Sequence, residues 1–154
     1  MKIRTGGLLV VGVLLIVLYF LNHKDIELSP ATSFHMYRIS ATGGELQEVI
    51  RLNNPNLLSS TIKSLHEKIY LNGALLGILD NELSQGIPGL KESEFPVSIR
   101  YSNSDIQKIL GTDSIPAGKL EVTIEGDIQF QNLFTSGKIT IHQSAPLTTE
   151  NNEK

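Results

Sequence analysis

The sequence predicts an all-β fold, an antiparallel β-sandwich with one short helix, preceded by a single N-terminal transmembrane helix. Apolar and polar residues alternate with a period of two through much of the chain, and turn residues recur between the alternating stretches. An uncharged apolar run stands apart at the N-terminus. Alternation is typical of strands that bury one face, and about seven such strands separated by turn signals are typical of a sandwich. Long helices do not alternate with the strands, so a doubly wound parallel sheet is not expected.

The composition is that of one folded domain with accessory segments. Of the 154 residues, 40% are hydrophobic and 19% are charged, and the net charge is -3. This balance excludes a disordered chain, and it lacks the basic excess of a protein that binds nucleic acid. The chain has no cysteine, which rules out disulfides, thiolate metal ligands and a cysteine nucleophile. No cofactor is predicted.

The N-terminal apolar run is interpreted as a membrane anchor. Lys2 and Arg4 precede the run Leu8–Leu21, which carries no charge. A bilayer core takes about 20 residues, with a lower limit of about 17, and Tyr19 and Phe20 suit the far interface. The basic residues favour the cytoplasmic side, so the following domain is predicted outside the cytoplasm, in a periplasm or at the cell exterior. A cleaved signal peptide is the alternative, but no A-x-A pattern follows the run.

The first half of the domain contains two stretches with strand spacing and one ambiguous segment. SFHMYRIS, beginning at Ser33, is a weak strand, and ELQEVIRL has an apolar face on which Glu48 is an exception. TIKSLHEKIYLNG has both helical and strand spacing. A strand is favoured there, with a bulge near Ser64 and Leu65 that absorbs the shift of parity.

The second half alternates more clearly. Pro96 has no amide donor, so the strand FPVSIRY should begin there or lie at a sheet edge. SNSDIQKIL reads as a short helix, because a serine or asparagine can cap it, Asp105 suits its first turn and Gly111 stops it. KLEVTIEGDIQF is the clearest strand, and Gly126 on its apolar face suggests a bulge or bend. KITI, which contains Ile139, is a further short strand.

These elements predict four segments along the chain. The irregular stretch Asp80–Phe95 is expected to be the longest loop, with apolar residues that either pack onto the core or serve binding. Packing onto the core is favoured. The predicted segments are a membrane anchor over 1–23, a linker over 24–32, the sandwich over 33–143 and a flexible tail over 144–154.

A polar corner, RLNNPNLLSSTI, interrupts the strand pattern. Asn53, Asn54 and Asn56 surround Pro55. Asparagine side chains bond neighbouring backbone groups and tolerate left-handed conformations, and proline fixes one backbone dihedral. No acidic, basic or nucleophilic residue stands among them. A turn between two strands is therefore favoured over a ligand site.

Several short motifs occur in a fixed order around this corner. LNNPN is followed by KIYLNGALLGIL, then by GIP and by an apolar alternating strand. This order resembles the late-embryogenesis-abundant group 2 family, whose domain is also called the water-stress and hypersensitive-response (WHy) domain. The resemblance covers about residues 33–142 and implies an immunoglobulin-like or fibronectin-III-like sandwich with a small helix. The residues that match the family pattern are Asn54, Pro55, Asn56, Tyr70, Gly73, Gly77, Ile87 and Pro88.

Residues able to perform chemistry are scattered. His35, His66 and His142 could meet only if separate strands brought them together, since no short ligand spacing links them. Glu125 and Asp127 alternate with polar neighbours on a strand face that is expected to be solvated. No enzyme is therefore predicted, and no residue is assigned as catalytic, cofactor-binding or metal-binding.

The function expected from these features is non-enzymatic. The resemblance implies a membrane-anchored domain with no known catalytic chemistry and an association with desiccation and other stress. The expected role is protection of, or interaction with, other components at the cell envelope, with the membrane, envelope proteins or lipid as partners and no nucleic acid. The alternative is a periplasmic peptide-binding, lipid-binding or assembly module without a stress role, which would use a sheet edge or the sandwich interior.

Overall fold

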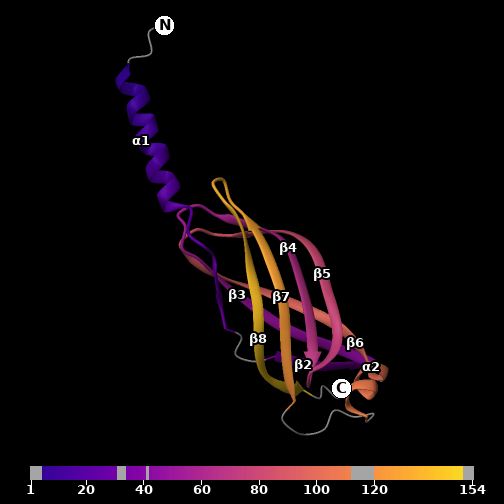
Figure 1. The fold of residues 1–154 in the computed structure, drawn as a ribbon. Coiled ribbons are helices and arrows are strands. Elements are labelled where there is room, and N and C mark those ends of the chain that lie inside the picture. The colour runs from indigo at the N-terminus through magenta and orange to yellow at the C-terminus, as the bar shows by residue number, and fades with distance from the viewer. Residues whose placement is uncertain (1–4, 31–33, 41, 112–119, 151–154) are drawn as a thin grey trace.

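The computed structural model describes residues 5–30, 34–40, 42–111 and 120–150 of the chain. It shows two packed β-sheets with a helix extending from one end (Figure 1). The elements in chain order are α1 (Thr5–Leu21), β1 (Glu27–Ser29), β2 (Phe34–Ser40), β3 (Gly43–Asn54), β4 (Ser60–Leu71), β5 (Ala74–Ile87), β6 (Lys91–Ser102), α2 (Asn103–Leu110), β7 (Glu121–Gln131) and β8 (Ser136–Glu150).

The sandwich is joined along one side and open along the other. In the first sheet β3 lies between β6 and the pair β1 and β2, and in the second sheet the order is β5, β4, β7, β8. β8 pairs with β7 up to Pro146 and then with β2 from Leu147 onward, so it links the two sheets. On the opposite side, the described pairings leave β5 and β6 as edge strands.

This topology confirms the sandwich and corrects one of its details. β8 runs parallel to β2, so the predicted purely antiparallel pairing is wrong at this pair. β8 also continues to Glu150, into the segment expected as a flexible tail, and β1 lies within the expected linker. The pairing of β1 with β3 and the pairing of β8 with β2 are both short. Each adds backbone hydrogen bonds that the hydrophobic pattern of the sequence does not encode.

The core forms where the inward faces of the two sheets meet. In β7 the predicted apolar face is buried, with Val122, Ile124, Ile128 and Phe130 almost inaccessible to solvent. Gly126 does not form the expected bulge, because its pairing with both neighbouring strands is regular. The glycine instead permits a close approach, since an added Cβ would overlap the carbonyl oxygen of His66.

Two ambiguous predictions of secondary structure are confirmed. β4 is a strand, and its pairing shifts register between Ile62 and Ser64, beside the predicted bulge. α2 is the predicted short helix. Ser102 caps it in a reciprocal capping box with Asp105, and Gly111 ends it in the left-handed conformation with φ 69°.

The stretch expected as the longest loop is largely strand. β5 extends to Ile87 and β6 begins at Lys91, so only a short turn separates them. Ile87 is fully buried and Leu83 packs partly against the core, whereas Leu90 is exposed. Inward packing therefore holds for two of the three apolar residues, but the loop itself was predicted wrongly because the polar residues of this stretch lie on an exposed edge strand.

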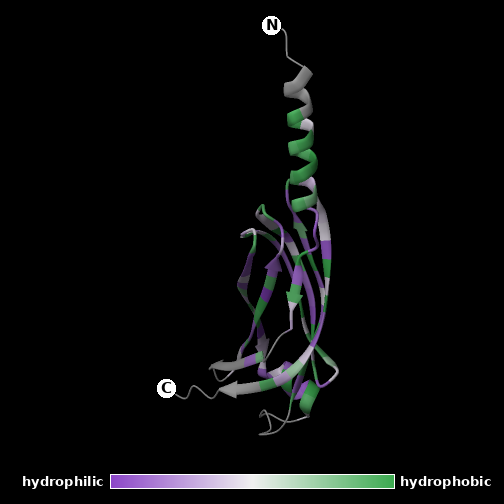
Figure 2. Cartoon of the chain, turned by 90° about the vertical axis from the view of Figure 1, so that its left-hand side faces the viewer, coloured by the Kyte–Doolittle hydropathy of each residue, from purple (hydrophilic) through white to green (hydrophobic). Residues whose placement is uncertain are grey.

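The predicted membrane span is also wrong. α1 contains 17 residues, and the part of it that Figure 2 colours by hydropathy is mostly hydrophobic. Among the described helices, however, none is long and apolar enough to cross a membrane. At about 1.5 Å per residue, such a helix measures about 26 Å, less than a hydrocarbon core of about 30 Å. The predicted localisation, anchored by one span with the domain outside the cytoplasm, depended on this helix and is corrected with it.

Candidate functional site

The asparagine corner is a buried hydrogen-bonding centre between β3 and β4. The Asn54 side chain donates to the carbonyl oxygens of Leu58 and Ile87, each at 3.1 Å. Its own oxygen accepts from the backbone and side-chain nitrogens of Asn56, at 3.1 and 3.0 Å. Both side chains are fully buried. The corner thereby connects the end of β3 to the turn that follows β5.

The same corner holds the segment that leaves α1. Asn56 donates to the Lys24 carbonyl oxygen and accepts from the Lys24 amide, both at 2.8 Å. The Leu58 amide donates to the Asn22 side chain at 2.6 Å. The amide groups of Asn54 and Asn56 thus bond the chain itself, which is the structural role favoured for this corner, and their donors are fully used.

The remaining motif residues fall into two groups. Pro55 is part of the asparagine corner itself, and Ile87 and Pro88 lie beside it. Ile87 pairs with Ser60 at the start of β4, and its carbonyl oxygen accepts a hydrogen bond from the Asn54 side chain. Tyr70, Gly73 and Gly77 lie at the other end of β4 and β5. The structure therefore brings Asn54, Pro55, Asn56, Ile87 and Pro88 together and does not join Tyr70, Gly73 or Gly77 to them.

The second group shapes the hairpin between β4 and β5. Asn72 and Gly73 both have positive φ, at 50° and 81°, as a tight two-residue hairpin turn requires. Gly77 faces the other sheet, where an added Cβ would contact the Ile99 side chain. Tyr70 is half-buried and pairs with Thr123 on β7. These positions favour a structural role for the hairpin residues.

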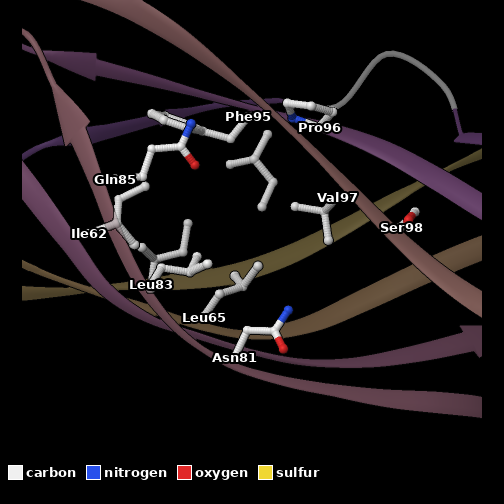
Figure 3. Close-up of a pocket in the computed structure, with 11 residues that line it drawn as sticks. Ile62, Leu65, Asn81, Leu83, Gln85, Phe95, Pro96, Val97 and Ser98 are labelled. Carbon is white, nitrogen blue, oxygen red and sulfur yellow. The ribbon is translucent and has the colours of Figure 1, made fainter.

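A cleft opens between the two edge strands β5 and β6. It has a volume of about 210 Å³. Figure 3 shows side chains of β5, among them Leu83 and Gln85, on one side of the space and Phe95 and Val97 of β6 on the other. The lining residues are Ile50, Ile62, Leu65, Asn81, Leu83, Gln85, Phe95, Pro96, Val97, Ser98 and Ile128.

The lining is apolar in its interior and neutral throughout. Ile62 and Leu65 of β4 and Ile128 of β7 form the interior part of the lining, and they are almost completely buried. Asn81, Gln85 and Ser98 supply polar groups from exposed positions on the edge strands. A cleft with an apolar interior and polar groups at its margin is typical of a site for a small organic ligand.

Two carboxyl groups lie in the sandwich interior next to this cleft. Glu67 of β4 is inaccessible to solvent and Glu48 of β3 is 6% exposed. Within the described part of the chain, Glu67 Oε1, Glu67 Oε2 and Glu48 Oε2 have no hydrogen-bond partner. Burial raises the pKa of Glu48 to about 7. Burial, followed by repulsion from Glu48, raises the pKa of Glu67 to about 8.

Sequence reasoning missed both the cleft and the carboxyl pair. Glu48 did stand out as an exception on an apolar strand face, and this was the available signal. Glu67 gave the same signal, because it stands at strand spacing between Leu65 and Ile69 on the inward face of β4. The cleft depends on two edge strands, and its lining comes from five strands that pair over long distances in sequence.

Solved structures share this architecture. A crystal structure of a protein from Archaeoglobus fulgidus matches with a TM-score of 0.55 at 11% identity, covering 82% of this chain and 97% of that one. A solution structure of a protein from Arabidopsis thaliana matches with a TM-score of 0.63 at 10% identity, covering 85% of this chain and 87% of that one. At these identities the likeness establishes the fold. No curated protein matches the chain.

The fold and the cleft define a β-sandwich domain with one open edge. The sequence profile of the family described as late embryogenesis abundant protein, LEA_2, matches residues 49–145. The chain belongs to this family, which confirms the resemblance found in the order of its motifs. The matched region contains the asparagine corner, the hairpin glycines and most of the residues that line the cleft.

Proposed function

We propose that the chain is a non-enzymatic binding module of the late-embryogenesis-abundant group 2 family, which holds an apolar ligand in the cleft between β5 and β6. The open edge carries this proposal. A volume of about 210 Å³ exceeds that of an apolar protein cavity of about 150 Å³ that accommodates benzene. The cleft therefore offers room for an aromatic ring or a short alkyl chain, and its neutral lining favours the apolar part of a ligand.

A nuclear magnetic resonance titration of the full chain with hexanol tests this function. Saturable shifts are expected for amides of the lining residues on β5 and β6. In Asn81→Trp the new ring should fill the cleft from an exposed edge position, and the shifts should disappear. Asp80→Trp is the matched control, because Asp80 is exposed on the same strand and does not line the cleft. Absence of saturable binding, or equal loss in both variants, would overturn the proposal.

A second candidate function is protection of other proteins during water stress. Family membership favours it, because the resemblance to this family implies an association with desiccation. The test is to dry or freeze a labile enzyme with the full chain or with an inert protein at equal mass. Greater recovery of enzyme activity with the chain would support protection, and equal recovery would exclude it. Retention of protection in Asn81→Trp would show that it does not require the cleft.

A further inference from the structure

The two buried carboxyl groups require a chemical partner that the described part of the chain does not supply. Three of their oxygens lack a donor, and neither residue takes part in an ion pair among the described residues. Leaving a buried polar group without a hydrogen-bond partner costs about 1–3 kcal/mol in a protein, and more when the group is charged. Such groups in a folded core call for an explanation in terms of a ligand, an ion or water.

Both carboxyl groups border the cleft from inside the sandwich. Glu48 and Ile50 project from the same face of β3, because residues two apart in a strand share a face, and Glu48 pairs across to Val97. Ile50 and Val97 both line the cleft. On the opposing sheet Glu67 projects inward as Leu65 does, and Leu65 is also part of the lining. The carboxyl pair thus lies beside the cleft, one inward-facing position further along β3 and β4 than the lining residues Ile50 and Leu65.

Among the described residues, the strand neighbours of the pair offer no positive charge. Glu67 is paired with Leu79 on β5 and with Gly126 on β7. Along their own strands the two residues are flanked on the inward face by Leu46 and Ile50, and by Leu65 and Ile69. Gly126 has no side chain to cover Glu67. The site therefore combines apolar surroundings with buried carboxyl oxygens that none of the described side chains satisfies.

We propose that the cleft and the Glu48–Glu67 pair form one binding site for a primary amine carried on an apolar group. A primary ammonium has three N–H donors and a positive charge, and the pair presents three buried oxygens without donors. Hydrogen bonds between charged partners are stronger than those between neutral ones. The apolar part of the ligand would occupy the cleft. This inference rests on the proposed binding function and specifies the chemistry of its ligand.

Three probes with the same alkyl chain test the head-group preference on the full chain at pH 8. Hexylamine should bind about tenfold or more tighter than hexanol in calorimetry, because charge-assisted hydrogen bonds replace neutral ones. Hexanoate should bind more weakly than hexanol, because it would place a third carboxylate near the pair. Equal affinity of the three probes, or tighter binding of hexanoate, would overturn the amine site while leaving an apolar cleft in place.

Isosteric variants identify the groups responsible. Glu67→Gln and Glu48→Gln should each reduce hexylamine affinity by about tenfold and lower the ratio of hexylamine affinity to hexanol affinity. Glu121→Gln, at an exposed position on β7, is the matched control and should change neither. Retention of the amine preference in both buried variants would overturn the inference. Failure of the unmodified chain to bind any of the three probes would instead overturn the proposed function.

Discussion

At the scale of single residues, neighbouring asparagines with the same chemistry have different roles. Asn54 and Asn56 are fully buried and bond backbone groups of three segments. Asn53, which directly precedes Asn54, is only half-buried, and its side chain donates to the Glu27 carboxylate at an exposed site. The alternation of strand β3 decides this difference, because it turns Asn54 inward and Asn53 outward.

Asn56→Ala should destabilise the chain strongly. The change removes the partners of the Lys24 amide and carbonyl and one donor to Asn54. Leaving buried polar groups unsatisfied costs about 1–3 kcal/mol each, so a loss of about 2–4 kcal/mol is expected. Urea unfolding measures it, with Asn53→Ala as the control at less than about 1 kcal/mol. Equal losses in the two variants would contradict a buried bonding centre.

The buried carboxyl groups make stability depend on pH. The pKa of Glu67 is about 8 and that of Glu48 about 7 in the folded chain, against an ordinary value of 4.5. An acid with a raised folded pKa binds its proton more tightly when folded. The stabilisation it gives is therefore complete below pH 4.5 and is lost as the pH rises through 7 and 8.

Unfolding by urea at pH 5, 7 and 9 measures this dependence. The free energy of unfolding of the unmodified chain should fall by about 2–4 kcal/mol over this range, since each unit of pKa shift corresponds to about 1.4 kcal/mol before screening and relaxation. Glu67→Gln should reduce the fall by about half, because one titrating group is removed. Stability that rises toward pH 9, or an identical profile in Glu67→Gln, would contradict a buried and unpaired carboxyl.

At the scale of the elements, a strand position requires glycine where the backbone of a neighbouring strand comes too close to admit a Cβ. Gly126 in the middle of β7 pairs regularly with β4 and β8 and leaves no room for a Cβ against His66. Gly86 near the end of β5 has open space around its Cα and no positive φ. Both glycines lie within strands. They differ in how closely a neighbouring strand approaches the position of an added Cβ.

Gly126→Ala should therefore weaken the pairing of β4 with β7. The added methyl group would force the backbone of two central strands apart, at a cost of about 1–3 kcal/mol. Gly86→Ala is the matched control and should change stability by no more than about 0.5 kcal/mol. Thermal unfolding of the two variants measures the difference. A neutral Gly126→Ala would show that β4 and β7 are not held as closely as described.

At the scale of the whole molecule, the asymmetry of the sandwich defines its binding side. β8 spans from one sheet to the other and joins them, while β5 and β6 remain unjoined edges with the cleft between them. Leu147 fixes this junction, because it is buried, pairs with Phe34 and donates its amide to Leu120 at 2.8 Å. One side is thus closed by backbone pairing, and the other is available to a ligand.

A chain that ends after Pro146 should lose this closure. Phe34 and the following residues of β2 would no longer pair with β8, and amide hydrogen exchange over 34–37 should accelerate by about tenfold or more as local opening becomes easier. Exchange in the middle of β4 and β7 should change less. A chain ending after Glu150 is the control, since it retains the β2–β8 pairing. Unchanged exchange over 34–37 would contradict a structural role for this junction.

The sequence by itself determined the two-sheet fold class, the strand nature of β4, the capped helix α2 and the family. These follow from local periods, caps and turn residues, which neighbouring side chains specify directly. Only the tertiary structure decided that β8 runs parallel to β2, that residues 80–95 form edge strands, that α1 is too short for a membrane span, and that Glu48 and Glu67 meet beside an open cleft. Such features depend on which distant strands pair and which edges stay unpaired, and a local hydrophobic pattern carries no information about either.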